Sequence, residues 1–292
     1  MSCKPLKVPN ESMRVMPYRR YSLVTDGFTV VDSCTKVPAT TGSMFLTEHL
    51  LLFVLQGTYI IRFGEQTYTL GKNQMVLLKK AIVVEYEKIG DPENDNFFEG
   101  MMFFLQDDLL KEFIKKVTVP AQKTDELSSI SVRNMTPRML GFVRSLIPYF
   151  SEFDKIDDGL IELKMLELVY GIAHMDKKLL FQLLHLKQQN RSDISRVLEE
   201  NYMNPVSIND LAYLSGRSLS SFKREFRAIY DIPPSRWLQK RRLKKAKELL
   251  ANTEMSVTDV CYTIGFENLS HFSRVYKSHY GHPPSLQKNN LS

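Results

Sequence analysis

The sequence lacks the long apolar runs that a membrane protein needs. Its longest runs, at 50–55 and 101–105, are of strand length, whereas a membrane-spanning helix takes about 20 residues. The first ten residues, MSCKPLKVPN, contain no apolar core of a signal peptide. Cysteine is scarce, and the spacing of the three present fits neither a zinc site nor a redox motif. These absences predict a cytoplasmic protein with free thiols at Cys3, Cys34 and Cys261.

Excess positive charge is missing from the first two thirds of the chain. Residues 1–189 hold 23 basic and 23 acidic side chains, while residues 190–292 hold 16 and 10 and so carry the whole net charge of +6. This asymmetry indicates a polyanionic partner for the C-terminal third, either nucleic acid or an anionic membrane surface. The membrane is the weaker match, because the basic residues are spread over several helices rather than along one strongly amphipathic helix.

Short strand-like runs fill the region from Phe28 to about Leu105. They are rich in Val, Ile, Leu, Phe and Tyr, and Gly or Asn separates them, which is typical of strands joined by tight turns. Their close spacing predicts an antiparallel sandwich or barrel rather than alternating strands and helices. The runs are FTVVDS, LLFVLQ, TYIIRF, QTYTL, QMVLL and VVEYE.

Helical periodicity replaces the strand pattern after Gln106. Apolar helix faces follow at 109–114, 140–150, 160–172 and 179–186, the second of them formed by Leu140, Val143, Ile147 and Phe150. A polar stretch at 187–192 predicts a boundary, and helices and turns are expected beyond it to Tyr280. The expected fold is α+β: a loosely ordered N-terminus at 1–20, a β-rich domain with a helical connector at 21–187, an all-helical domain at 188–286 and a tail at 287–292.

A sequence repeat dominates the C-terminal third. DLAYLSG begins at Asp210 and DVCYTIG at Asp259, and the offset of 49 residues becomes 50 after one inserted residue. Two copies of one structural unit are therefore predicted. The later matches are Phe222 with Phe272, Arg224 with Arg274, Phe226 with Tyr276, Tyr230 with Tyr280, and the Pro-Pro pair at 233–234 with that at 283–284.

Each copy contains the parts of a helix-turn-helix in the same order. A Ser-x-x-Asp start caps the first helix, and a small residue permits a close crossing of the second. A Gly then suits a turn with positive φ, and a polar residue caps the second helix. These residues are Ser207, Ala212, Gly216 and Ser218 in the first copy and Ser256, Cys261, Gly265 and Asn268 in the second.

The second helix of each copy divides into an apolar and a polar face. The apolar positions, Leu219, Phe222 and Phe226 with their matches Leu269, Phe272 and Tyr276, are expected in the core. The polar faces offer side chains for base edges and cations for phosphates, as a DNA-recognition helix requires. A solvated charged face is the plainer explanation for either helix alone. The candidate DNA-binding residues are Ser220, Lys223, Arg224, Arg227, Ser270, Ser273, Arg274 and Lys277.

A basic helix is predicted between the copies at 235–250, after the first Pro-Pro pair. Sixteen residues of helix span about 24 Å, enough to hold two recognition helices toward successive major-groove faces on one side of duplex DNA. Its expected buried residues are Trp237, Leu238, Leu243, Ala246, Leu249 and Leu250. Its cations are expected to be mostly exposed and placed to touch phosphate: Arg236, Lys240, Arg241, Arg242, Lys244, Lys245 and Lys247.

Residues from about 191 to 285 resemble the DNA-binding domain of the AraC/XylS family. The resemblance rests on RLKKAKELL at 242–250, VTDVCYTIGF at 257–266 and HFSRVYKSHYGHPPS at 271–285. It implies a bacterial transcription regulator, usually an activator, that binds promoter DNA and works with RNA polymerase. The family's closing Pro-Ser-x-Tyr-Arg reads Pro-Ser-Leu-Gln-Lys at 284–288, so its final aromatic anchor is missing. The strand pattern resembles the family's cupin-like regulatory domain, and the layout is most similar to the subgroup of the type III secretion activator.

An enzyme is the alternative, because many cupin barrels hold a metal. Metal cupins use a His-x-His pair, a Glu and a later His, whereas the stretch Glu48-His49-Leu50 has no second histidine nearby. His49 is therefore expected to be a polar residue at a strand start. No Ser/His/Asp set, phosphate loop or dinucleotide fingerprint is present. We expect no enzymatic activity, no metal and no cofactor, and keep a cupin-type metalloenzyme with an appended nucleic-acid-binding domain as the alternative.

Two further partners are expected at the first 189 residues. The regulatory domain is expected to sense a signal, either a small molecule in the barrel or a regulatory protein on its surface. A homodimer is expected because apolar side chains nearly surround the helix at 160–172 and crowd the next at 179–186. Packing of both helices on the β-rich domain and on each other is the other explanation.

Overall fold

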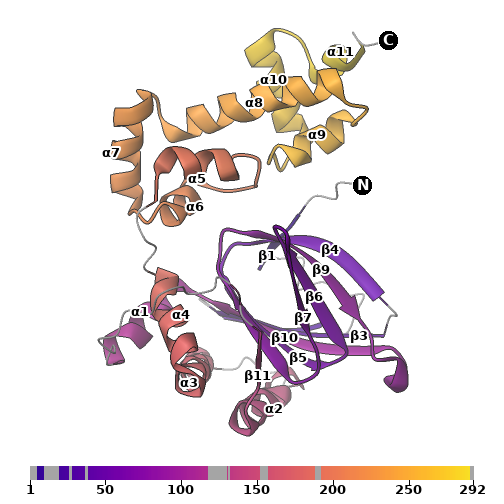
Figure 1. The fold of residues 1–292 in the computed structure, drawn as a ribbon, viewed down its shortest axis with the longest axis vertical. Helices are drawn as coiled ribbons and strands as arrows, with labels where there is room; N and C mark the ends of the chain where they lie inside the picture. The colour runs from indigo at the N-terminus through magenta and orange to yellow at the C-terminus, as the bar shows by residue number, and fades with distance from the viewer. Residues whose placement is uncertain are drawn as a thin grey trace. The chain divides into compact units, whose positions relative to one another are not determined.

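The chain forms two compact units, residues 6–188 and residues 189–292 (Figure 1). The computed structural model describes residues 5–9, 20–25, 28–36, 39–117, 130, 132–151, 157–187 and 192–289. Within these residues no helix is long and apolar enough to cross a membrane. The two units are called the N-terminal unit and the C-terminal unit below.

Two β-sheets form the body of the N-terminal unit. One has the strand order β1-β4-β9-β6-β7 and the other β11-β8-β5-β10-β3-β2. Neighbouring strands pair antiparallel, as predicted, apart from β1 and β4, which are parallel. The strands are β1 (Leu6–Val8), β2 (Arg20–Thr25), β3 (Phe28–Lys36), β4 (Ala39–Leu46), β5 (His49–Gln56), β6 (Thr58–Phe63), β7 (Gln66–Leu70), β8 (Gln74–Leu78), β9 (Val83–Ile89), β10 (Phe97–Leu105) and β11 (Val132–Asn134).

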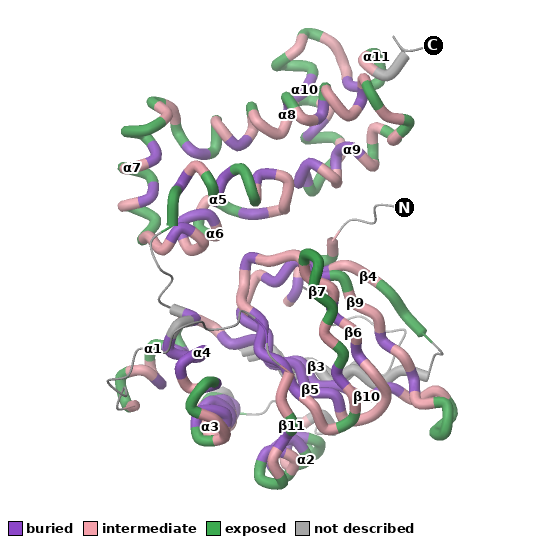
Figure 2. The backbone as a smooth tube through the Cα atoms, in the orientation of Figure 1, coloured by how far each residue is buried: buried purple, intermediate pink, exposed green. Residues whose placement is uncertain are grey.

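The central strand β5 explains the longest apolar run in the sequence. It pairs with β8 on one side and β10 on the other. Alternate side chains of a strand point to opposite faces. Leu51 and Phe53 join a cluster with the helices of this unit, while Leu50 and Leu52 join a cluster with the first sheet. Both faces of β5 are therefore buried, as the purple trace in Figure 2 shows.

Four helices cover the outer face of the second sheet (Figure 1). They are α1 (Asp107–Lys116), α2 (Pro137–Ser151), α3 (Asp158–Met175) and α4 (Lys177–Lys187). The predicted apolar face of α2 was wrong by about one residue: Leu140 is only partly buried and Ile147 is 46% exposed. The ring of Phe142 packs on Phe103 of β10, and this contact turns α2 so that its buried residues are Met139, Phe142, Val143 and Leu146. The side chain of Phe150 lies outside the described residues.

Two terminal segments that were expected to lack structure contain regular elements. Leu6–Val8 forms β1, in which Val8 is 1% exposed and its carbonyl accepts hydrogen bonds from the backbone N–H and the hydroxyl of Thr47, at 2.8 and 2.9 Å. This pairing is long-range, so no local pattern reveals it. Residues 1–4 and 10–19 lie outside the described part. The expected tail at 287–292 begins inside α11 (Pro284–Asn289), and residues 290–292 are not described.

His49 is the first residue of β5, as predicted for a strand start, and its side chain is fully buried. Its Nδ1 accepts a hydrogen bond from the Lys80 backbone N–H at 3.2 Å. Burial, together with the positive charges of Lys80 and Lys79, lowers the pKa of His49 well below its ordinary value, so the imidazole is neutral. Among the described residues, no three His, Cys, Asp or Glu side chains form a group that could hold a metal ion.

The C-terminal unit is built from helices alone within the described residues. Figure 1 shows α8 running between two groups of helices, with α5, α6 and α7 at one end and α9, α10 and α11 at the other. The expected α+β architecture, with two helix-turn-helix copies joined by a linker helix, is confirmed. The bounds are α5 (Ile194–Asn201), α6 (Ile208–Leu214), α7 (Leu219–Tyr230), α8 (Pro234–Asn252), α9 (Val257–Thr263), α10 (Leu269–Tyr280) and α11.

Candidate nucleic-acid interface

Helices α6 and α7 form the first helix-turn-helix. The Ser207 hydroxyl accepts from the Asp210 backbone N–H at 3.1 Å, and the Asp210 carboxylate accepts from the Ser207 N–H at 2.8 Å, which completes the predicted capping box. The turn follows at Gly216, whose φ is +68°. Ser218 then caps α7 by accepting from the Ser221 N–H at 3.3 Å. Each such cap stabilises its helix by about 1 kcal/mol.

Helices α9 and α10 repeat this construction. The Ser256 hydroxyl accepts from the Asp259 N–H at 3.0 Å, and Asn268 accepts from the His271 N–H at 2.9 Å. Gly265 has a φ of +82° at the turn. The inserted residue of the repeat falls in this turn, because three residues separate Gly265 from α10 whereas two separate Gly216 from α7. The predicted caps and positive-φ turns are confirmed in both copies, and the complete capping box is confirmed in the first.

Matching aromatic ladders fix the inner faces of α7 and α10. The ring centroids of Phe226 and Tyr230 lie 4.6 Å apart, and those of Tyr276 and Tyr280 lie 4.7 Å apart. Leu219 is 36% exposed and Leu269 only partly buried, so the prediction of core positions was wrong for the first residue of each helix. These residues begin the helices beyond the edge of the core. The fully buried positions are Phe222, Phe226, Phe272 and Tyr276.

The candidate DNA-binding residues lie on the outer faces of α7 and α10. Ser273 is half-buried, and the other seven are exposed. Those of α7 are Ser220, Lys223, Arg224 and Arg227, and those of α10 are Ser270, Ser273, Arg274 and Lys277.

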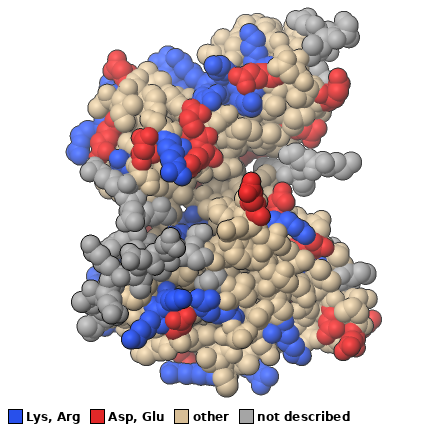
Figure 3. All heavy atoms as spheres, in the orientation of Figure 1, with Lys and Arg blue, Asp and Glu red and all other residues tan. Residues whose placement is uncertain are grey.

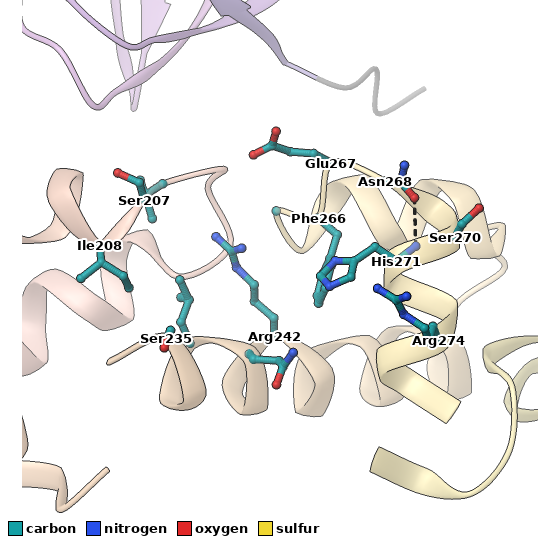
Figure 4. Close-up of a pocket in the computed structure, with 14 residues that line it drawn as sticks. Ser207, Ile208, Ser235, Arg242, Phe266, Glu267, Asn268, Ser270, His271 and Arg274 are labelled. Carbon is teal, nitrogen blue, oxygen red and sulfur yellow. Dashed lines mark hydrogen bonds between the residues drawn. The ribbon is translucent and has the colours of Figure 1, made fainter. Parts of the chain in front are cut away.

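Two neighbouring hollows separate the recognition helices. The first, of about 570 Å³, is lined by Lys223 and Arg227 of α7. The second, of about 860 Å³, is lined by Ser270 and Arg274 of α10 and is drawn in Figure 4. Three residues line both hollows and so connect them: Ser207, Ile208 and Ser235. The remaining candidates, Ser220, Arg224, Ser273 and Lys277, line neither hollow.

The lining residues show which edge of each polar face borders a hollow. Successive helical residues are rotated by about 100°, so Lys223 and Arg227 lie toward one edge of the polar face of α7. On α10 the lining residues Ser270 and Arg274 match Ser220 and Arg224, which lie toward the opposite edge. The polar face of α7 therefore borders one hollow and the polar face of α10 borders the other, and the two hollows share part of their lining.

Helix α8 forms the floor between the two copies. Ser235, Leu238, Gln239 and Arg242 share one stripe at helical spacing and line the second hollow. The exposed cations lie roughly on the opposite side of α8, which places them away from the hollows: Arg236, Lys240, Lys244 and Lys247. Figure 3 shows Lys and Arg (blue) gathered over the region of α8, with acidic residues (red) among them.

Three expectations for α8 are corrected by its packing. Trp237 and Leu249 are only partly buried. Trp237 packs at the edge of the first aromatic ladder, 5.5 Å from Tyr230. Arg242, expected to be exposed, donates to the backbone carbonyls of Tyr202 at 2.7 Å and Asn204 at 2.6 Å. The charge pattern of the sequence did not indicate that Arg242 is bonded inside the unit, because its partners are main-chain carbonyls about 40 positions away.

Family comparisons match both units. Residues 211–289 match the helix-turn-helix domain family, and residues 49–186 match the ExsA N-terminal regulatory domain. The virulence regulon transcriptional activator VirF of Yersinia enterocolitica is 25% identical over 237 residues, which cover 80% of this chain and 87% of VirF. The transcriptional regulator ExsA of Pseudomonas aeruginosa is 23% identical over 247 residues, covering 82% of this chain and 86% of ExsA.

Two solved structures also match this chain, at TM-scores below 0.5. ToxT from Vibrio cholerae matches with 13% identity and a TM-score of 0.42, covering 92% of this chain and 99% of ToxT. The DNA-binding domain of the transcriptional factor AdpA, solved with a target DNA, matches with 24% identity and a TM-score of 0.32 and covers 34% of this chain and 93% of that domain.

Proposed function

This chain belongs to the AraC/XylS family of transcription regulators, and we propose that it binds promoter DNA with α7 and α10 in successive faces of the major groove. The resemblance seen in the sequence, including the subgroup of the type III secretion activator, is confirmed by the match to the ExsA N-terminal regulatory domain. The protein is a sequence-specific DNA-binding regulator, and its relative VirF is a transcriptional activator.

The observation that carries the proposed binding mode is that the exposed polar faces of α7 and α10 border two hollows with a shared lining. Arg224 and Arg274 occupy matched positions, and a guanidinium can bond both acceptors of a guanine edge. Lys223, Arg227 and Lys277 flank them and pair with phosphates. The serines Ser220, Ser270 and Ser273 are short enough to hydrogen-bond either bases or phosphates. We assign the exposed cations on the far side of α8 no contact with this DNA.

The N-terminal unit is proposed to receive the signal, which is a small molecule in the β-rich body or a regulatory protein on its surface. The DNA-bound regulator then works with RNA polymerase as an activator, in the cytoplasm, where bacterial promoters lie. No step of this function is enzymatic. The alternative of a cupin-type metalloenzyme has no support in the named relatives, which are transcription regulators.

Recovery of DNA from a random pool of duplexes by the full-length chain tests this function directly. We expect an enriched site with two half-sites whose centres lie about one helical turn, 10–10.5 base pairs, apart. A double variant, Arg224→Ala with Arg274→Ala, is the matched control and should enrich no site. A chain that recovers duplexes without any shared sequence would contradict the proposal.

A homodimer is proposed through α3. The packing of α3 and α4 on each other and on the sheet buries most of their apolar side chains, including Ile161, Leu168 and Leu179. On α3, however, Leu163 is 64% exposed and Leu160 is 40% exposed. The exposed apolar surface expected from the sequence is therefore limited to the edge of α3 formed by Leu160 and Leu163. This edge can pair with the same edge of a second chain around a two-fold axis.

Leu163→Asp is expected to convert the dimer to a monomer, because a carboxylate would be buried opposite its own copy. Sedimentation of the full-length chain at tens of micromolar should show the loss of mass, with the circular dichroism spectrum unchanged. Leu286→Asp is the matched control, since Leu286 is 52% exposed but lies in the C-terminal unit, and it should leave the mass at that of a dimer. A monomeric wild-type chain would remove the proposed dimer.

A further inference from the structure

The turn of the second helix-turn-helix packs directly on the connection that leads from α5 into the first. A Cβ added at Gly265 would lie 2.7 Å from the carbonyl oxygens of Met203 and Asn204 and 2.9 Å from Nη2 of Arg242. Real Cβ atoms do not approach other atoms this closely. Three segments therefore meet without a gap: the turn between α9 and α10, the middle of α8, and the connection between α5 and α6. This meeting point is called the inter-copy clamp below.

Arg242 bonds α8 to the α5–α6 connection and lies against the turn of the second copy in the inter-copy clamp. Its Nε donates to the carbonyl of Tyr202 and its Nη2 to that of Asn204, at 2.7 and 2.6 Å. Burial lowers the pKa of this guanidinium to about 10, and the nearby carboxylate of Glu267 acts in the opposite direction. Removing a guanidinium from water is costly, and charge-assisted hydrogen bonds to fixed carbonyls offset that cost. Figure 4 shows Arg242 rising from α8 between Ser207 on one side and Phe266 on the other.

The inter-copy clamp restrains the relative orientation of the two copies, which α8 alone does not. A helix fixes the distance between its two ends, but either copy could still tilt or swing where it joins the helix. The clamp ties the second copy to a loop of the first at a point beside α8. With two attachments instead of one, the separation and the relative rotation of α7 and α10 are both set.

We propose that Arg242 is a positioning residue for DNA recognition, which sets the spacing of half-sites that this regulator accepts. The inference rests on the proposed binding of two half-sites by α7 and α10. One base pair changes the separation of two half-sites by about 3.4 Å and their relative rotation by about 35°. A rigid pair of recognition helices rejects such a change, whereas a loosened pair tolerates it at the expense of affinity.

The first test measures the clamp without DNA. Spin labels are attached through cysteines at Ala228 and Ser278, which are matched, exposed positions on α7 and α10, in a full-length chain whose three native cysteines are replaced by alanine. We expect one narrow distance distribution in this parent chain and a distribution at least twice as wide after Arg242→Met. Lys240→Met is the matched control on the exposed side of α8 and should leave the distribution narrow.

The second test uses the duplex selected by the full-length chain, the same duplex with one base pair inserted or removed between the half-sites, and each half-site alone. Arg242→Met should bind the selected duplex at least tenfold more weakly and each half-site within twofold of the wild type. The loss of affinity caused by the altered spacing should be smaller for Arg242→Met than for the wild type. Equal weakening on half-sites and the full site, or an unchanged spacing penalty, would overturn the proposal.

Failure of the proposed function and failure of the role assigned to Arg242 give different results in these two tests. A chain that binds no specific duplex removes the proposed function, while the width of the distance distribution still decides whether the clamp holds the two copies. If Arg242→Met does not fold, Arg242→Lys decides, because its single ammonium keeps the charge but reaches one carbonyl at a time. A distribution as narrow as that of the parent chain in the folded lysine variant would exclude the role assigned to Arg242.

Discussion

Raising the salt concentration from 50 to 200 mM is expected to weaken binding of this chain to its DNA site about fortyfold. Each phosphate that a protein neutralises releases condensed cations, so the logarithm of the affinity falls with that of the salt concentration by about 0.9 per phosphate. The C-terminal third carries the whole net charge of +6. The proposed interface places three of its cations on phosphates, Lys223, Arg227 and Lys277, which gives a slope of about −2.7.

The measurement is a titration of labelled duplex with full-length chain at several salt concentrations, followed by fluorescence anisotropy. Residues 189–292 form a compact unit of their own, and a fragment with these residues should show the same slope. A duplex of scrambled sequence should show a similar slope at lower affinity, because phosphate contacts carry no sequence information. A slope shallower than about −1 would mean that the basic faces of α7 and α10 do not lie on the phosphate backbone.

Alanine at Arg224 or Arg274 is expected to weaken specific binding by about 1–3 kcal/mol each, or about 5- to 150-fold. An arginine that bonds both acceptors of a guanine loses both bonds and leaves the base edge unsatisfied. Because the two arginines lie on separate recognition helices, footprints of the variants should lose protection over different half-sites. The two lost regions should lie about one helical turn apart.

Lys240→Ala is the control for both arginine variants. Lys240 is an exposed cation on the side of α8 away from the hollows, so its removal lowers the net charge by one without touching the proposed interface. Its affinity should stay within about threefold of the wild type. Footprints in which both arginine variants lose protection at the same bases would contradict the assignment of one half-site to each helix.

Sequence alone reveals the C-terminal unit in detail because its signals are local. A capping box needs only Ser207 and Asp210, and a left-handed turn needs only a glycine such as Gly265. The repeat doubles the evidence, since each signal occurs twice at a fixed offset. The linker helix and the predicted polar faces of the second helices follow from the same spacing.

The features that sequence analysis missed depend on contacts between distant residues. Leu6–Val8 forms a strand only because β4 offers it an edge. On α2 two apolar stripes one residue apart fit the helical period equally well, and packing on Phe103 selects between them. In the sequence Arg242 is one of several cations in a basic run. Only its hydrogen bonds to the carbonyls of Tyr202 and Asn204 distinguish it from its neighbours.

The two copies of the helix-turn-helix follow one another along the chain instead of facing each other across a two-fold axis. A two-fold protein matches a palindrome, which reads the same from either strand. Here Lys223 and Arg227 stand where the second copy has Ser273 and Lys277, so the half-sites are not interchangeable. In the proposed binding mode the DNA site therefore has two different ends, and one molecule binds it in one orientation only.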